Sequence, residues 1–387
     1  MKILFITHDA SRTGGPILLR NFMQWISDNT NHEFELLYRA GGILEPDFDQ
    51  ITTTEIFYPK YYNNYHTIGQ KILNRLGYYK FRLKKHHQFL LNKYKEQKFD
   101  IIYSNTVVNL DVLQVLNQLQ IPIITHVREL ESSIEHYGGT KLIEGLNKFN
   151  KHFIADSNAV KDNLIKKHAI KENKIEVVHE YVELPNELPN ENVTNSLKKE
   201  LGIPENAFVV GASGGGLWRK GYDLFIQTAI ASCKMEGNEN VFFIWVGGFK
   251  PEKEDEIAFD LEKSELKNRI LFVGAQKKPL DYFSLFDVFV LASREEAFGI
   301  VGMESALFET PVLCFENSGG MPEFITQECG IAVPYLDIPK LVDAIQFLKD
   351  NENQRKQYGL NARNKVLSAH TLEIKSKELL KIMGEQL

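Results

Sequence analysis

Short runs of apolar residues alternate with longer stretches of mixed polarity along the whole chain. In the first half the runs cover residues 2–7, 33–38, 100–104, 121–126, 152–156 and 175–179. Their consecutive apolar positions are typical of parallel strands that helices cover on both faces. The stretches between the runs are long enough to hold crossover helices. The first half therefore predicts a parallel α/β sheet.

The pattern breaks once and then restarts. Residues 184–196 are polar, contain two prolines and show no helical or strand period, so they predict a linker. Apolar runs resume at residues 208–212, 241–246, 270–273, 288–291 and 312–315. We expect Rossmann-like domains at 1–183 and 197–370, with a C-terminal helix at 371–387 that joins the first domain. Two doubly wound sheets imply a cleft between domains, with ligands beyond the carboxyl ends of the strands.

Length and composition agree with a two-domain protein. The chain has 387 residues, of which 43% are hydrophobic and 25% are charged. Its net charge of -6 argues against nucleic acid as a partner. The three cysteines lack metal-site spacing and suit free thiols in a reducing compartment. Because no apolar stretch approaches the roughly 20 residues of a spanning helix, we expect a cytoplasmic protein, at most peripheral at the inner face of the membrane.

The segment after the run at 288–291 combines two carboxylates with a predicted helix start. Glu296 precedes a helix that opens near Gly299, and Glu304 lies more than a turn inside it. Unpaired N–H groups at a helix start suit a diphosphate. A carboxylate suits the two vicinal hydroxyls of a ribose. Solvated glutamates that merely favour the helix dipole would give the same spacing, so the spacing alone leaves both interpretations open.

A glycine-rich loop with two cations follows the run at 208–212. Gly214 begins a row of three glycines, and Arg219 and Lys220 come a few residues later. Glycines allow the backbone to approach a ligand closely, and cations neutralise a leaving diphosphate. A flexible loop with two solvated basic residues is the alternative. The glycine patterns of dinucleotide-binding and P-loop proteins are absent.

These motifs together resemble a known family. The Glu296-x7-Glu304 pair, followed by Thr310-Pro311-Val312 and by Gly319-Gly320-Met321-Pro322-Glu323, resembles the donor-site signature of retaining glycosyltransferase family 4, the group 1 glycosyltransferases. The resemblance is densest over residues 208–325. It implies the GT-B fold, in which two doubly wound Rossmann-like domains face a cleft. It also implies retaining, metal-independent transfer of a sugar from a UDP- or GDP-sugar, with no further cofactor. The acceptor would be a glycan or a lipid-linked saccharide in surface polysaccharide biosynthesis.

The resemblance also assigns roles to individual residues. Glu304 would hold the ribose hydroxyls and Glu296 would contact the donor sugar, while Lys220, with Arg219, would neutralise the diphosphate. Glu296 and Lys220 are thereby catalytic candidates. The backbone of the donor site would come from Gly214, Phe298, Gly299, Ile300 and Val301. The family usually has glycine just before Thr-Pro-Val, where this chain has Glu309.

The first half offers a loop and a histidine. Gly14 and Gly15 lie between the first predicted strand and a helix expected from residue 17. They fit the flexible family loop that closes over the donor, although a simple tight turn would need the same glycines. His126 ends the run at 121–126, at the edge where a reactive group is expected. The resemblance makes it a catalytic candidate, and a structural histidine is the alternative.

Metal binding is not expected, and the only DxD pattern considered lies early in the chain. Asp47-Phe48-Asp49 falls in a predicted loop and not beyond a strand of the donor domain. Two other classes of function stay open. The same fold can carry a sugar phosphorylase or epimerase, and the chain could be a non-catalytic nucleotide-sugar-binding protein.

Residues 58–98 form a basic, aromatic segment. They contain ten Lys and Arg residues against one acid, Glu96. The aromatic residues of the segment include Tyr61, Tyr62, Tyr65, Tyr78, Tyr79 and Phe81. Such a segment binds anionic lipid head groups or a charged acceptor, and a solvated helix is the alternative. We expect it to face the acceptor or a membrane that carries a lipid-linked one.

Overall fold

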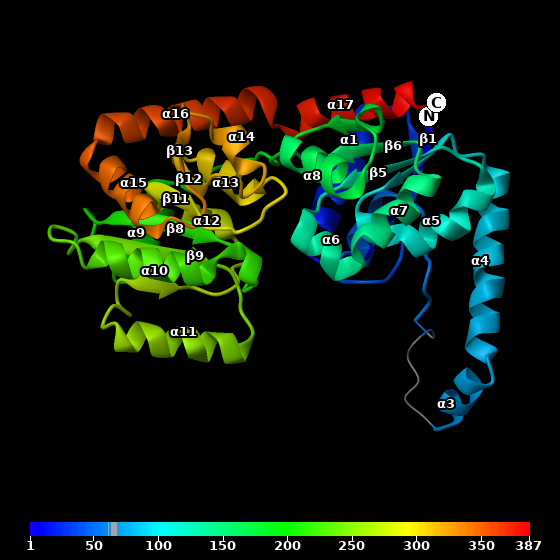
Figure 1. The fold of residues 1–387 in the computed structure, drawn as a ribbon, viewed down its shortest axis with the longest axis horizontal. Coiled ribbons are helices and arrows are strands. Elements are labelled where there is room, and N and C mark those ends of the chain that lie inside the picture. Colours follow the sequence, from blue (N-terminus) through cyan, green and yellow to red (C-terminus); the bar gives the residue numbers. More distant parts are fainter. Residues whose placement is uncertain (61, 63–67) are drawn as a thin grey trace. The chain divides into compact units, whose positions relative to one another are not determined.

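The computed structural model describes residues 1–60, 62 and 68–387. The chain divides into two compact units. Met1–Val178 and Leu372–Leu387 form the first unit, and His179–Thr371 forms the second. Each unit contains one parallel sheet with helices packed on it (Figure 1). Tyr61 and Tyr65 of the basic segment lie outside the described residues.

The first unit has a seven-stranded sheet in the order β3-β2-β1-β4-β5-β6-β7, with all neighbours parallel. The strands are β1 (Lys2–Thr7), β2 (Glu33–Tyr38), β3 (Thr54–Ile56), β4 (Ile101–Ser104), β5 (Ile123–Val127), β6 (His152–Ala155) and β7 (Ile175–Val177). The strand order reverses between β1 and β4. In doubly wound sheets this reversal marks the switch point, where ligands bind at the carboxyl ends of the strands.

Helices from both ends of the chain complete the first unit. They are α1 (Gly14–Asn29), α2 (Glu45–Ile51), α3 (Ile68–Arg75), α4 (Tyr78–Gln97), α5 (Leu110–Leu116), α6 (Glu131–Tyr137), α7 (Gly139–Phe149), α8 (Asn158–His168) and α17 (Leu372–Glu385). The C-terminal α17 packs against α1. Its Leu379 and Met383 are buried in the same core as Phe5 and Phe22. The hydrophobic effect therefore holds the C-terminus on the first unit.

The second unit has a six-stranded parallel sheet in the order β10-β9-β8-β11-β12-β13. The strands are β8 (Phe208–Ser213), β9 (Val241–Val246), β10 (Ile270–Phe272), β11 (Val288–Leu291), β12 (Val312–Phe315) and β13 (Gly330–Val333). The helices are α9 (Glu191–Glu200), α10 (Tyr222–Cys233), α11 (Pro251–Lys263), α12 (Pro279–Phe283), α13 (Ile300–Ala306), α14 (Met321–Ile325), α15 (Ile338–Asp350) and α16 (Glu352–Ala369). Consecutive residues such as Phe289 and Val290 enter different core clusters. Both faces of the sheet are thus buried, which explains the continuous apolar runs.

The predicted α/β fold of two doubly wound sheets is confirmed. Three expectations about local structure are wrong, and the first is the loop expected at Asp47-Phe48-Asp49, which is part of α2 (Glu45–Ile51). The sequence predicts an irregular linker over 184–196, whereas α9 begins at Glu191 because the Asn190 side chain accepts hydrogen bonds from the backbone N–H groups of Asn192 and Val193. The sequence places Gly14 and Gly15 in a loop before a helix at residue 17, whereas α1 already begins at Gly14.

The division between the units also differs from the expected 183/184 boundary. Residues 179–183 belong to the second unit. The backbone N–H of Val182 donates to the carbonyl of His370 at 2.8 Å. Nδ1 of the His370 ring is hydrogen-bonded to the carbonyl of Glu180 at 3.0 Å. These bonds fasten the segment that follows β7 to the end of α16.

Candidate active site

Two loops meet at the switch point of the second unit, because β8 and β11 are neighbouring strands there. The backbone N–H of Arg294, after β11, donates to the carbonyl of Arg219, after β8, at 2.8 Å. Gly221 makes this approach possible. Its φ is +69°, and a Cβ at this position would lie 1.8 Å from the carbonyl oxygen of Ala292. A side chain at residue 221 would push the two loops apart.

The contact between the loops brings Lys220, Arg219 and Glu296 together. The Lys220 ammonium pairs with Oε2 of Glu296, and Nη1 of Arg219 lies 3.4 Å from the same oxygen. The side chains of Lys220 and Glu296 are only 16% and 13% exposed. Burial alone would raise the pKa of Glu296, but the two cations outweigh it and hold that pKa below its usual value. Glu296 is therefore ionised at neutral pH.

The backbone of Glu296 is fixed by the glycine loop after β12. Its N–H donates to the carbonyl of Ser318 at 2.8 Å, and the N–H of Gly320 donates to the Glu296 carbonyl at 3.2 Å. Gly319, between them, pairs with Glu296 as an isolated parallel bridge and has a φ of +128°. The glycine motif at residues 319–323 thus holds the backbone of Glu296, the first residue of the glutamate pair, in place.

Gly214 lies beside the same cations. Its carbonyl accepts a hydrogen bond from the indole N–H of Trp245 at 2.9 Å. A Cβ at residue 214 would meet the side chain of Lys220 at 3.4 Å. The glycine row after β8 therefore leaves the Lys220 side chain close to the backbone of the loop.

The predicted helix start near Gly299 is confirmed. Gly299 has a φ of +97° and precedes α13, whose first residues Ile300 and Val301 are partly exposed. Phe298 is 1% exposed and packs against the rings of His179 and His370, with centroids 4.9 and 5.6 Å away. The side chain of Phe298 is thus anchored in the core.

Glu304 differs from Glu296 in its surroundings. No described residue forms an ion pair or a side-chain hydrogen bond with its carboxyl group. Burial raises its pKa to about 7. The two glutamates therefore differ in charge at neutral pH. Glu296 is ionised and paired with cations. Glu304 is close to half-protonated and has no partner among the described residues.

His126 lies in the first unit, as the fourth of the five residues of β5, and is 2% exposed. Its Nε2 is 2.5 Å from Oδ1 of Asp156, which follows β6. Its Nδ1 contacts the hydroxyl of Tyr103 and lies 3.2 Å from Nη2 of Arg128. His126 is thus near the end of its strand, as the sequence predicts, and its ring lies within a buried polar network.

This network extends to the glycines of α1. The carbonyl of Gly15 accepts from the amide of Asn105 at 2.8 Å, and Asn105 accepts from Nε of Arg128 at 3.1 Å. Gly14 has no neighbouring atom within 4 Å of a would-be Cβ. Asn105, Arg128 and Asp156 were not among the sequence candidates. A signal existed, since each follows the end of a strand at the edge where ligands bind.

The Asp47-Phe48-Asp49 pattern lies within α2. Asp47 lies 3.7 Å from Arg20, and Asp49 accepts from Thr54 at 2.5 Å. Within the described part of the chain, none of the helices has the length and apolar character needed to cross a bilayer.

Comparison with known families identifies the region that holds the cation cluster. Residues 193–365 match the model of the family "Glycosyl transferases group 1". The lipopolysaccharide core biosynthesis mannosyltransferase LpsB of Rhizobium meliloti is 30% identical over 162 residues, which cover 40% of this chain and 45% of LpsB. The capsular polysaccharide biosynthesis glycosyltransferase CapM of Staphylococcus aureus is 25% identical over 231 residues, 58% of this chain and 59% of CapM. The chain thus aligns with only about half the length of these relatives.

Solved structures match the whole chain. HepE of Anabaena, in complex with UDP and glucose, superposes with a TM-score of 0.81 at 20% identity and full coverage of both chains. WaaG, a glycosyltransferase involved in lipopolysaccharide biosynthesis, superposes with a TM-score of 0.70 at 15% identity, covering 98% of this chain and 99% of WaaG. The two doubly wound sheets and the site at the second switch point define the fold class as that of GT-B glycosyltransferases. Residues 193–365 match the group 1 glycosyl transferases, in agreement with the resemblance of the sequence motifs, whereas the assignment to the retaining family 4 stays a prediction.

Proposed function

We propose that this chain is a retaining, metal-independent glycosyltransferase. It transfers a sugar from a nucleoside diphosphate sugar to a glycan or lipid-linked acceptor in the synthesis of a surface polysaccharide. The cluster of Lys220, Arg219 and ionised Glu296, within a group 1 domain, carries this proposal. The names of LpsB and CapM, a lipopolysaccharide and a capsule enzyme, support the assignment to surface polysaccharides.

The cluster supplies the charge that the reaction needs. When the bond between the anomeric carbon and the phosphate oxygen breaks, negative charge develops on the leaving diphosphate. Lys220 and Arg219 stabilise that charge in place of a metal ion, and Glu296 holds both cations in position before the donor arrives. The acceptor hydroxyl attacks the anomeric carbon from the face that the diphosphate leaves. Its proton passes to the departing phosphate oxygen, so the anomeric configuration is retained.

Glu304 is assigned to the nucleoside end of the donor. A carboxylate accepts hydrogen bonds from the two vicinal hydroxyls of a ribose, and the Glu304 carboxyl has no competing partner among the described residues. Gly299 and the first residues of α13 present backbone N–H groups between the two glutamates. HepE was solved with UDP, which makes uridine donors the first to test.

A sugar phosphorylase or an epimerase is not favoured, since the relatives described above are transferases by name. A phosphorylase would require inorganic phosphate and release a sugar phosphate. A non-catalytic nucleotide-sugar-binding protein would bind a donor without ever releasing the nucleoside diphosphate. One experiment separates these functions.

We expect the purified protein, with EDTA present, to be stabilised by one nucleotide sugar from a panel of UDP- and GDP-sugars and to hydrolyse it slowly to the nucleoside diphosphate. Both cations are built into the chain, so chelation should leave the rate unchanged. Thermal shift and nucleoside diphosphate release are the measurements. Activity that EDTA abolishes and Mg²⁺ restores would contradict metal independence. Stabilisation without any product would favour the binding protein.

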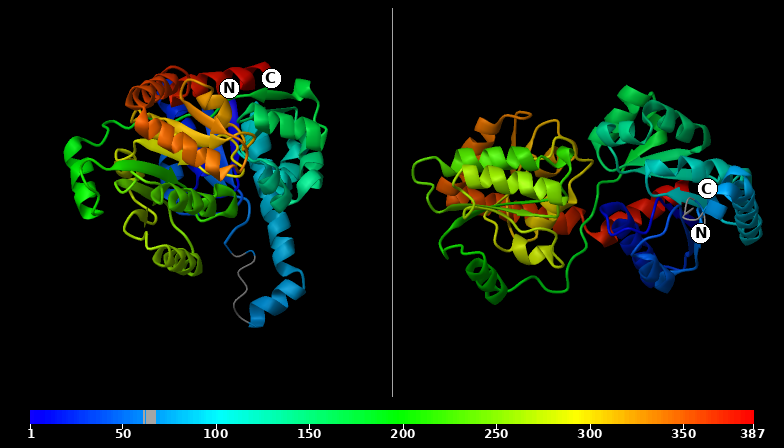
Figure 2. Two further views of the ribbon diagram at one scale, coloured as in Figure 1. Left: turned by 60° about the vertical axis from the view of Figure 1, so that its left-hand side comes forward. Right: turned by 90° about the horizontal axis from the view of Figure 1, so that it is seen from below.

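We also propose that the arm formed by α3 and α4 binds an anionic membrane surface. Figure 1 and the left view of Figure 2 show α4 extending away from the sheet of the first unit, with α3 at its far end. The arm and its connection expose Ile72, Leu73, Leu76, Tyr78, Phe81 and Phe89. Lys71, Arg75, Lys80, Lys84 and Lys85 form no ion pair with a described residue. Exposed apolar side chains among unpaired cations complement anionic lipid head groups.

We expect the full-length protein to sediment with vesicles that contain phosphatidylglycerol, and the bound fraction to fall as salt rises. Phe81→Ser should reduce binding several-fold, because an inserted aromatic ring is lost. Phe259→Ser is a matched control, since Phe259 on α11 is 60% exposed against 57% for Phe81. Each ring also has a lysine four residues later over its face. Equal losses in the two variants, or binding that salt leaves unchanged, would contradict the role of the arm.

A further inference from the structure

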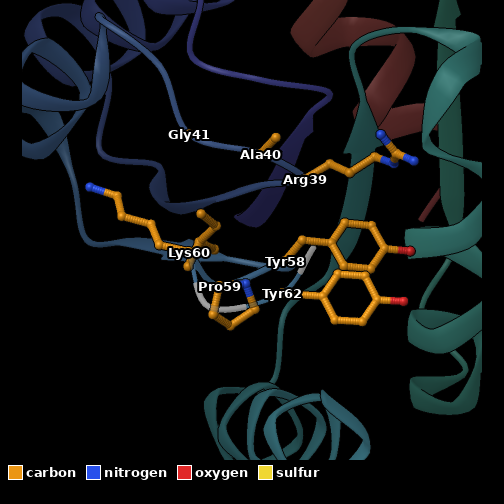
Figure 3. A pocket seen from close by; sticks show the side chains of 8 residues that line it. Arg39, Ala40, Gly41, Tyr58, Pro59, Lys60 and Tyr62 are labelled. Carbon is orange, nitrogen blue, oxygen red and sulfur yellow. The ribbon is translucent and has the colours of Figure 1, made fainter. Parts of the chain in front are cut away.

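A pocket of about 440 Å³ opens in the first unit (Figure 3). It is lined by residues 39–41, by Ile56, by residues 58–60 and by Tyr62. Residues 39–41 follow β2, and residues 58–60 follow β3 closely. The pocket therefore lies at the carboxyl edge of the sheet, where doubly wound proteins bind their ligands, and its volume suits a small ligand.

Arg39 is fixed within this pocket. Its Nε donates to both carboxylate oxygens of Asp111, at 3.0 and 2.8 Å, and its guanidinium lies over the Tyr58 ring, 5.3 Å from the centroid. The Tyr58 hydroxyl donates to Asp111 at 2.8 Å. Tyr62 stacks on Tyr58, with centroids 5.1 Å apart, and Figure 3 shows the two rings side by side. Asp111 thus orients Arg39 and Tyr58, and the terminal Nη groups of Arg39 have no acceptor among the described residues.

The polar side chains of the lining are donors. Among the described residues, the lining contains no carboxylate and no amide side chain. Lys60 is exposed and, within the described chain, has no ion-pair partner. The charge of Arg39 is balanced by Asp111, so Lys60 gives the pocket a net positive charge. Arg and Lys donors that lack an acceptor match a phosphate or carboxylate group, and the adjacent tyrosines offer apolar ring surface to a sugar.

We propose that this pocket is an acceptor subsite that binds the phosphate or carboxylate group of an anionic saccharide. The inference rests on the proposed transferase function and names the class of its acceptor. Asn105 follows β4 and donates to the carbonyl of Gly15 at the start of α1, and β3 is two strands away from β1. Two strand spacings are about 10 Å, a span that a short saccharide bridges. Figure 3 shows the Lys60 ammonium pointing away from Arg39, so the anionic group then binds at Lys60, while the sugar lies along the tyrosine rings towards Arg39 and a hydroxyl further along the saccharide reaches the switch point.

Ligand-observed NMR titration of the full-length protein tests the subsite with glucose 1-phosphate, glucuronate and glucose. The two anionic sugars should bind and glucose should bind at least about tenfold more weakly. Lys60→Ala should weaken the anionic sugars by about tenfold, and Lys60→Arg should restore them. Lys141→Ala, which removes an exposed lysine from α7 of the same unit, should match the wild type. Equal binding of glucose, or an unchanged Lys60→Ala variant, would overturn the proposal.

Two further experiments are needed. The first distinguishes a saccharide from a lipid head group as the bearer of the anionic group, and the second distinguishes the acceptor proposal from the transferase proposal. Vesicles that contain phosphatidylglycerol but no saccharide should not displace glucose 1-phosphate from the wild type. If they displace it from the wild type alone and not from Lys60→Ala, the pocket binds a lipid head group and the acceptor proposal is wrong. Donor hydrolysis in the absence of acceptor is measured on the wild type alone, so that it tests the transferase function independently of the pocket. A wild-type protein that hydrolyses none of the nucleotide sugars would contradict the transferase function, whatever the pocket binds.

Discussion

Replacing Lys220 with alanine is expected to lower the turnover number for sugar transfer by about 10²- to 10³-fold, the usual effect of removing a group that stabilises developing charge. Of the two cations, Lys220 makes the shorter contact with Glu296 and has the more buried side chain. Without it, Arg219 alone faces the leaving diphosphate. The donor should still bind, since Glu304 and the backbone of α13 are untouched, so the KM for the donor should change much less than the turnover number.

Steady-state kinetics and thermal denaturation of the same preparations separate catalysis from folding. Lys375→Ala is the matched control, because Lys375 is also a buried lysine in an ion pair, with Glu378 at 2.9 Å, but lies on α17. It should lose stability and keep its turnover number. Lys220→Arg keeps the charge and should recover part of the activity. A Lys220→Ala enzyme with normal turnover, or one whose whole loss appears in the donor KM, would remove Lys220 from the catalytic step.

The sequence predicted the inner strands of both sheets and missed two edge strands. β3 and β13 stand at one edge of their respective sheets. β3 is the short run Thr54–Ile56, none of whose residues is fully buried, and β13 begins at Gly330 and has two partly exposed residues. An edge strand needs a partner on only one side and covers less core, so its composition is freer. The continuous apolar runs that reveal an inner parallel strand are absent there.

The errors at Gly14 and in the linker have a local cause. Glycine is a poor helix former and Pro16 disfavours a helix interior, but neither is costly in a first turn, where the N–H groups have no intrahelical partner. In the linker, the single side chain of Asn190 starts α9 within a segment that has no helical period. Glu309 is the reverse case, since it keeps a φ of +57° where the family has glycine. A left-handed backbone costs a non-glycine residue about 1–2 kcal/mol, which the surrounding fold must offset.

The candidate site was predictable where one motif holds several of its residues. Glu296, Gly299 and Glu304 are close in sequence, and the helix between them follows from that spacing. The ion pair of Glu296 with Lys220 joins residues 76 positions apart, so no local pattern reveals it. The same applies to the network of His126, Asn105 and Arg128, which depends on the order of the strands. The sequence named Glu296, Lys220 and His126 but not Asn105 or Arg128, and the sheet topology decided which of these groups meet.

Glu304→Gln is expected to weaken donor binding at pH 8 by about 10- to 100-fold, the worth of hydrogen bonds to a charged group. Burial raises the pKa of Glu304 to about 7 in the ligand-free protein. The carboxylate that accepts from the ribose hydroxyls is therefore the minor form below pH 7 and the major form above it. Donor affinity of the wild type should rise with pH through 7, and the glutamine variant should show no such rise.

The stability of the ligand-free protein should fall as pH rises, whereas donor affinity rises. This difference distinguishes a glutamate that binds the ribose from one with a structural role only. A carboxyl group with a pKa of 4.5 unfolded and about 7 folded binds more protons in the folded state between these values, so stability is lost as pH rises through 7. At pH 8 the uncharged glutamine should thus raise the melting temperature of the ligand-free protein while it weakens the donor. Glu309→Gln, at an exposed glutamate just beyond α13, is the control and should leave donor affinity unchanged. A Glu304→Gln protein that is more stable and binds donor normally would show that the carboxylate does not contact the ribose.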